Sequence, residues 1–308
     1  MKSRRPLLYA TVLAGALLAL GLYGRATHDP AAVELASPPD SASPAKETGA
    51  PVARPAPVVP PLDTSTPPRA LPPPGTINEL AAKAGAGDAI AACQLAAELI
   101  QCRAGQTLRR HLRDTESVAT PRCEELLGQH LDRHLDLLRQ AAHAGEPEAM
   151  LRYAMGEGFG LHGASFDYLR SPGFDTWRRE APGMLQSLLE AGYPEAVIYR
   201  MLANEPGLGG PLANLLQGDP VQDQAYGELF LLLNEETPLL EMMRTQIRSR
   251  ANETVREQAQ QQAERWHQDH FRGQTFDFSA LESESESGYP LMRAHGANCS
   301  VPVREATP

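Results

Sequence analysis

Apolar residues recur at helical spacing through most of the chain after Thr76. Ile77 and Leu80 share one helical face at the start of this region. Thr76 and Glu79, a hydroxyl followed three residues later by an acid, predict a capping box for the first helix. Further helices are predicted over residues 89–102, 123–143, 219–233 and 238–272. We therefore expect an all-α fold for residues 76–272.

Short corners with the same order of residues interrupt this pattern at three places. They read Ala-Gly-Asp-Ala-Ile-Ala from Ala86, Ala-Gly-Glu-Pro-Glu-Ala from Ala144 and Ala-Gly-Tyr-Pro-Glu-Ala from Ala191. A glycine just past a helix closes it in the left-handed conformation, and a proline two residues later fits the next helix's first turn. The neighbouring acid favours the positive end of the helix dipole, and the last alanine allows close helix packing. The predicted turn and packing residues are Ala86, Gly87, Ala91, Gly145, Pro147, Ala149, Gly192, Pro194 and Ala196.

The repeated unit is a helix–turn–helix hairpin that resembles the Sel-like repeat, a relative of the tetratricopeptide repeat. That family has a pair of alanines, a glycine, an alanine four residues later and then a Leu-Gly pair. Ala141, Ala142, Gly145 and Ala149 match this order, with Tyr153-Ala154 at the Leu-Gly position. The resemblance adds Ala141 and Ala142 to the packing residues and implies an α/α-hairpin solenoid with a concave groove for a partner. An irregular helical domain with Ala-Gly corners is the alternative.

The N-terminal residues have the pattern of a membrane segment. Three basic residues within residues 1–5 precede an uncharged apolar run, residues 7–23, near the minimum length for a transmembrane helix. The position of this charge predicts a cytoplasmic N-terminus and an external remainder. Residues 1–25 are therefore interpreted as a retained anchor or a cleaved signal sequence. Arg25 and the lack of an A-x-A site favour the anchor.

Two further segments differ in composition from the helical region. Residues 26–75 are rich in Pro and Ala, so they are predicted to form a disordered, semi-rigid linker, or alternatively a ligand for a Pro-binding module. Residues 273–308 include an acidic Ser/Glu run and are predicted to be an irregular tail. The chain would then consist of a 1–25 anchor, a 26–75 linker, a 76–272 helical-repeat domain and a 273–308 tail.

Four cysteines predict two disulfides, because an even number outside the cytoplasm is typical of a disulfide framework. Cys93 and Cys102 are ~13 Å apart on one predicted helix, beyond disulfide reach. Cys102 ends that helix and Cys123 begins the next, so we predict a Cys102–Cys123 pair. Cys93–Cys299 follows by elimination and would attach the tail to the first hairpin.

The net charge and the absence of known motifs exclude several classes of function. A formal net charge of −10 argues against nucleic-acid binding. His130 and His134 lie four apart on a predicted helix, and His267 and His270 share another face, but no H-E-x-x-H is present. We interpret all four as surface histidines and predict no catalytic residue, metal or cofactor.

One predicted loop, residues 156–177, is rich in aromatic residues. It is interpreted either as core filler or as a partner surface formed by Phe166, Tyr168, Phe174 and Trp177. We expect a non-enzymatic protein of the bacterial envelope, held in the inner membrane by residues 7–23, whose periplasmic domain binds a protein or peptide partner. A secreted or periplasmic protein after signal cleavage is the alternative location. An envelope-acting hydrolase with a site near the 156–177 loop is the alternative function.

Overall fold

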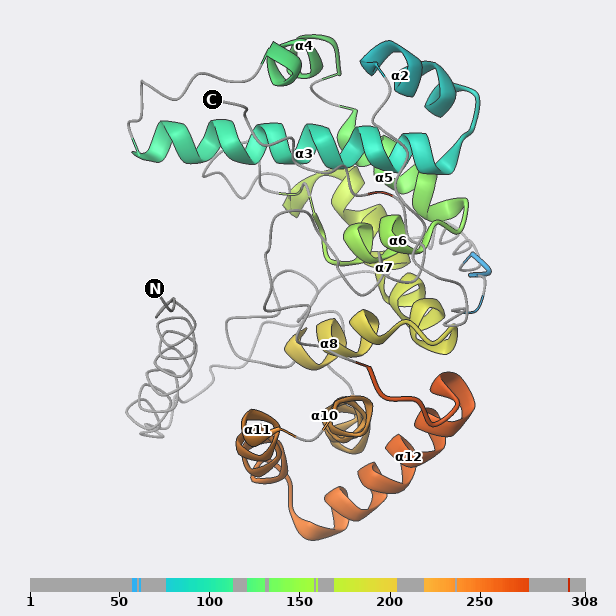
Figure 1. Cartoon of the computed structure of the whole chain (residues 1–308), viewed down its shortest axis with the longest axis vertical. Helices are drawn as coiled ribbons and strands as arrows, with labels where there is room; N and C mark the ends of the chain where they lie inside the picture. Colours follow the sequence, from blue (N-terminus) through green and yellow to red (C-terminus); the bar gives the residue numbers. More distant parts are fainter. Residues whose placement is uncertain are drawn as a thin grey trace, which may run out of the picture. The chain divides into compact units, whose positions relative to one another are not determined.

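The computed structural model describes residues 57–59, 61, 76–112, 121–130, 133–157, 159, 169–203, 219–235, 237–276 and 299. These residues confirm the predicted all-α fold, since they form ten helices and, apart from one isolated bridge between Asn234 and Phe276, no β structure. All of them belong to one compact unit that begins at Val52. The helices are α2 (Ile77–Gly85), α3 (Ala89–Leu112), α4 (Pro121–His130), α5 (His134–His143), α6 (Pro147–Ala154), α7 (Pro172–Glu190), α8 (Pro194–Ala203), α10 (Pro220–Leu233), α11 (Pro238–Arg248) and α12 (Glu253–Phe271) (Figure 1).

The predicted membrane anchor, residues 7–23, lies outside the described residues. Within the part of the chain that the structure describes, no helix combines the length and the apolar character needed to cross a bilayer.

Several helices begin at residues whose local chemistry favours a helix start. The capping box is present, because the Thr76 hydroxyl accepts from the Glu79 amide at 3.2 Å and the Glu79 carboxylate accepts from the Thr76 amide at 2.9 Å. Proline occupies the first position of six of the ten described helices. Its fixed φ suits the first turn, where the missing N–H leaves no bond unmade.

The three repeated corners share one backbone geometry. Gly87, Gly145 and Gly192 have φ values of 94°, 83° and 86°, in the left-handed region that favours glycine. At the second corner, the Gly145 amide donates to Ala142 O at 3.0 Å and the Glu146 amide donates to Ala141 O at 3.2 Å. The other two corners repeat this Schellman pattern. The three glycines therefore close their helices in the left-handed conformation.

Most of the predicted packing residues are buried, but one is not. Ala86 is exposed at the end of α2, so this position contributes to the turn and not to packing. The buried members are Ala91, Ala141, Ala142, Pro147, Ala149, Pro194 and Ala196.

Three predicted helix boundaries were wrong. The polar stretch after Cys102 continues α3 to Leu112. The predicted helix 123–143 is two helices, α4 and α5. The predicted helix 238–272 breaks after Arg248, and the Asn252 side chain caps α12 by accepting from the Val255 amide at 3.0 Å.

Helices pack mainly against their neighbours along the chain. α3 contacts α2, α4 and α5, and contacts then continue from α5 to α6, α7, α8 and α10. α10 is buried nearly all round because α11 and α12 flank it as well (Figure 1). Gly227 brings α11 close to α10, since a Cβ built there would lie 2.7 Å from Ile247 Cγ2.

Both predicted disulfides are present. Cys102–Cys123 joins α3 to α4, beside a two-pronged ion pair in which Arg122 donates to Glu98 at 2.7 and 2.8 Å. Cys93–Cys299 joins α3 to the tail. The second bond brings a residue from near the C-terminus into the middle of the helical unit.

Candidate functional site

The corner between α5 and α6 gathers chain segments from both ends of the protein. Its sequence Gly145-Glu146-Pro147-Glu148 closes α5 and starts α6. Pro147 and Glu148 occupy the first turn of α6, where an acid is stabilised by the helix dipole. In the structure, however, Glu148 has no exposed surface. A buried carboxylate needs partners, and they define this site.

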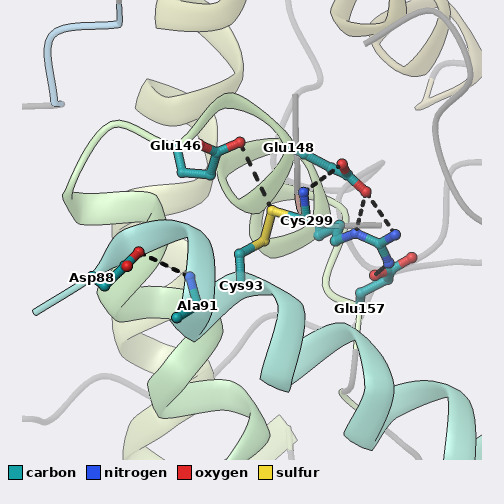
Figure 2. Close-up of a disulfide and its surroundings, with 8 residues drawn as sticks. Asp88, Ala91, Cys93, Glu146, Glu148, Glu157 and Cys299 are labelled. Carbon is teal, nitrogen blue, oxygen red and sulfur yellow. Dashed lines mark hydrogen bonds and ion pairs between the residues drawn. A yellow bond between two sulfur atoms is a disulfide. The ribbon is translucent and has the colours of Figure 1, made fainter. Parts of the chain in front are cut away.

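Glu148 accepts hydrogen bonds from the Arg152 side chain and from the main chain of Cys299. Its Oε1 accepts from Arg152 Nε at 3.0 Å and from Arg152 Nη2 at 2.8 Å, one helical turn along α6. Its Oε2 accepts from the main-chain N–H of Cys299 at 3.1 Å (Figure 2). The carboxylate thus holds a residue that lies 151 positions away in the sequence.

Arg152 connects Glu148 to a second carboxylate. Its Nη1 donates to Glu157 Oε2 at 2.7 Å. Glu157 reaches back because Gly156, with φ of 73°, ends α6 in the same left-handed turn that closes the repeated corners. One guanidinium therefore bridges two carboxylates, and the Cys299 amide supplies a further donor to the buried one.

The Cys93–Cys299 disulfide fixes the tail at this position. Both half-cystines have no exposed surface, so solvent reductants have no direct access to the bond. Figure 2 shows Cys299 between Cys93 on α3 and the acidic corner, with its Sγ 3.9 Å from Glu146 Oε1. A disulfide sulfur carries no proton, so this last approach is a packing contact.

A segment of the predicted linker contacts the same corner. We call residues 57–59 and 61 the linker strap. A Cβ built on Gly145 would lie 3.0 Å from Val58 O, so the absence of a side chain admits the strap backbone. Val59 belongs to the hydrophobic core and is 9% exposed, whereas Val58 is 93% exposed. Part of the predicted disordered linker is therefore packed on the helices.

The neighbouring corner takes part in this arrangement. Burial raises the pKa of the Tyr193 hydroxyl to about 12, and the carboxylates of Glu146 and Glu195 act in the same direction. Glu146 of one corner is thus electrostatically coupled to Tyr193 of the next. Pro61 of the linker strap lines a hollow of about 100 Å³ together with Ala191 and Gly192. The strap therefore reaches both corners.

A second polar cluster joins α5, α6 and α7 at Glu180. This carboxylate accepts from Arg139 at 2.9 and 2.6 Å and from the Tyr153 hydroxyl at 3.0 Å, and His143 Nε2 lies 3.2 Å from it. Burial acts to raise the pKa of Glu180, but the hydrogen bonds from Arg139 and Tyr153 outweigh it and lower the pKa. A carboxylate with a low pKa and several donors is a poor general base, so we interpret the cluster as a structural cross-link.

The region around α10, α11 and α12 contains a hollow of about 410 Å³. Two arginines line it, and both are paired with acids: Arg248 with buried Glu228 at 3.2 Å, and Arg244 with Glu241. The two arginines of this hollow are therefore engaged in ion pairs within the protein.

Of the two interpretations of the aromatic residues, core filler describes the two that the structure includes. Trp177 is fully buried and Phe174 is 9% exposed, stacked with ring centroids 5.2 Å apart, and Trp177 Nε1 donates to Tyr153 O at 2.6 Å. They are core filler because α7 packs their faces against α6. Phe166 and Tyr168 lie outside the described residues.

The histidine interpretation also needs correction. His130 ends α4 and His134 begins α5, so the two do not share one helix. His134 is buried, and Arg103 Nη1 lies 3.5 Å from its Nδ1. Among the described residues, no group of three His, Cys, Asp or Glu side chains is arranged to hold a metal ion.

Sequence reasoning missed the buried acids Glu148 and Glu195. Both follow the corner proline, and both are at most 1% exposed. The repeated Pro-Glu-Ala at the second and third corners was the available signal. Comparison of the chain with known protein families, with curated proteins and with solved structures finds no match.

Proposed function

We propose that this protein is a non-enzymatic scaffold of the bacterial envelope whose helical repeats bind extended segments of a protein partner. Neighbouring helices pack in chain order, and three corners repeat one Schellman geometry. Both features are typical of an α/α-hairpin solenoid and support the Sel-like assignment. Such arrays use their surfaces for recognition.

The hydrogen bond from the Cys299 amide to the Glu148 carboxylate carries the proposal. A main-chain N–H is present in every peptide except at proline, so a carboxylate that accepts it recognises chain geometry independently of side chains. Cys299 is not part of any helix. The repeat face thus already binds one non-helical residue by its backbone, which is the interaction that a peptide partner requires.

The two disulfides support an oxidising compartment. Combined with the apolar run at residues 7–23, they favour a single inner-membrane anchor with the helical domain in the periplasm. A periplasmic or secreted form after signal cleavage would place the domain in the same oxidising environment.

The hydrolase alternative lacks support at the residues that would serve it. Among the described residues of the 156–177 segment, Phe174 and Trp177 fill the core, and the nearby Glu180 carboxylate has a lowered pKa. Neither arrangement provides an activated base or nucleophile.

Site-specific photo-crosslinking in intact bacterial cells tests the scaffold function. A photoreactive amino acid replaces Ala144, which is exposed at the Gly145 corner, or, as a control, Glu257, which is exposed on α12. We expect position 144 alone to give adducts that map to one segment of a partner, and a synthetic peptide of that segment to bind the purified full chain. The same adducts at both positions, or only adducts within the chain, would contradict the proposal.

A further inference from the structure

We infer that the edge formed by the Gly145 and Gly192 corners is a track for proline-rich extended segments, and that the linker strap occupies it as an internal competitor. This inference rests on the proposed scaffold function and names the class of segment that the scaffold binds. It begins with the exposure pattern of the strap. Val58 and Pro61 are exposed and Val59 is buried.

That pattern fits the three-residue period of polyproline II, in which positions three apart share one face. Three residues of this helix advance about 9 Å. Packed helices lie about 8–10 Å apart, which is close to this advance. The contacts agree with this match: Val58 O approaches Gly145, and Pro61 shares a hollow with Gly192.

The corners are suited to a backbone that makes few hydrogen bonds. Their own amides already donate within the Schellman turns, as the Gly145 amide does to Ala142 O at 3.0 Å. A proline has no N–H to satisfy, and its fixed φ reduces the entropy lost when the segment binds. A glycine at the corner leaves room for the approaching main chain. The track therefore favours proline over residues whose amide would need an acceptor.

Val59 supplies the apolar anchor of the strap. Its side chain joins the core, while the neighbouring Val58 side chain stays in solvent at 93% exposure. The strap has no covalent bond to the track, unlike the tail, which is held by Cys93–Cys299. A partner segment with the same spacing of valine and proline can therefore replace the strap while the tail stays in place.

Fluorescence anisotropy of a labelled peptide with the sequence of residues 56–62 tests the inference on the full chain. Val59→Asp weakens strap docking, and Val58→Asp is the matched control with the same change at an exposed position. We expect Val59→Asp to bind the peptide at least about ten-fold more tightly than Val58→Asp or the unmodified chain, because the internal competitor is lost. If the two variants bind the peptide with equal affinity, the inference that the strap competes for the track is overturned.

A second variant guards against misfolding of Val59→Asp. Replacing residues 57–61 by Gly and Ser removes the polyproline bias without placing a charge in the core. Circular dichroism checks that it is folded. If the folded Gly/Ser variant fails to bind the peptide, the inference that this edge binds proline-rich segments is overturned.

The last control substitutes the corner glycines in the folded Gly/Ser variant, in which the strap no longer occupies the track. Gly145→Ala should abolish peptide binding, whereas Gly87→Ala, with the same left-handed strain and no atom within 4 Å of the added Cβ, should retain it. An equal loss of peptide binding in both variants would overturn the inferred contact between the peptide and Gly145. If proline-rich peptides fail to bind but position 144 still crosslinks to a partner segment of other composition, this inference falls and the scaffold function stands.

Discussion

Replacing Glu148 by Gln tests whether the buried carboxylate holds the α5–α6 corner together. The change keeps the shape of the side chain but removes the charge that Arg152 pairs with, inside a site where Glu148 has no exposed surface. Removing one partner of a buried ion pair costs about 3–5 kcal/mol. Arg152 keeps its bond to Glu157 at 2.7 Å, so we expect the lower end, about 3 kcal/mol. For a domain of this size, that loss lowers Tm by about 6–12 °C.

Thermal and urea unfolding of the oxidised chain, followed by circular dichroism, measure this loss. Glu241→Gln is the matched control, because it removes the same charge from an i,i+3 pair whose carboxylate side chain is 64% exposed. We expect the control to leave Tm within about 2 °C. Hydrogen exchange adds a local measurement: the Cys299 amide should exchange faster in Glu148→Ala, which removes its acceptor.

Equal Tm values for Glu148→Gln and Glu241→Gln would refute the reasoning. Unchanged exchange of the Cys299 amide in Glu148→Ala would refute the main-chain contact on which the scaffold function depends. The two results are separable, since the first reports on the ion pair and the second on the tail.

Three further predictions concern packing, the disulfides and pH. Gly227→Ala should destabilise the fold by about 1–3 kcal/mol in urea unfolding, because the added Cβ lies 2.7 Å from Ile247 Cγ2. Gly128→Ala, where nothing lies within 4 Å, should instead stabilise α4 by about 0.5–1 kcal/mol, and the reverse order would contradict this packing. Loss of Cys93–Cys299 by serine substitution should lower stability by about 5 kcal/mol and loss of Cys102–Cys123 by about 3 kcal/mol, because the closed loops span 206 and 21 residues. A calorimetric Tm order opposite to this would show that loop entropy does not decide their contributions. Hydrogen bonds from Arg139 and Tyr153 outweigh the effect of burial and lower the pKa of Glu180, so its contribution is present above the ordinary value of 4.5 and is lost as pH falls below it. Glu180→Gln should flatten the fall of stability on acidification, and an unchanged pH profile would exclude this role.

Local features of the fold were predictable because local chemistry determines them. Gly145 and Gly192 take left-handed φ values that close the preceding helix. Each is followed by a proline that begins the next helix and by a buried alanine. The break between α11 and α12 was harder, because residues that suit a helix run continuously through it. Only Asn252, which caps α12, marks the break in the sequence. A polar residue of this kind is equally compatible with the solvated surface of a continuous helix.

Non-local contacts set the limits of prediction at the candidate site. An acid after the corner proline predicts a dipole interaction, and Glu148 does lie in the first turn of α6. One of its hydrogen-bond donors, however, is the amide of Cys299, a residue 151 positions away that a disulfide ties to α3. The pairing of cysteines was deducible from helix geometry, but the amide that accompanies Cys299 into the site was not.

The linker strap shows why composition alone wrongly predicts disorder for such a segment. A proline-rich stretch has too little apolar surface to fold alone, which is a statement about the isolated segment. Val59 needs only one apolar recess, and Gly145 provides room for the backbone beside it. Because the strap and Cys299 meet the same corner from opposite ends of the chain, a segment that displaces the strap changes the surroundings of the Glu148 cluster. Partner binding at Gly145 and the hold on the tail are therefore expected to be energetically coupled, and the Cys299 amide exchange rate measures that coupling when peptide is added.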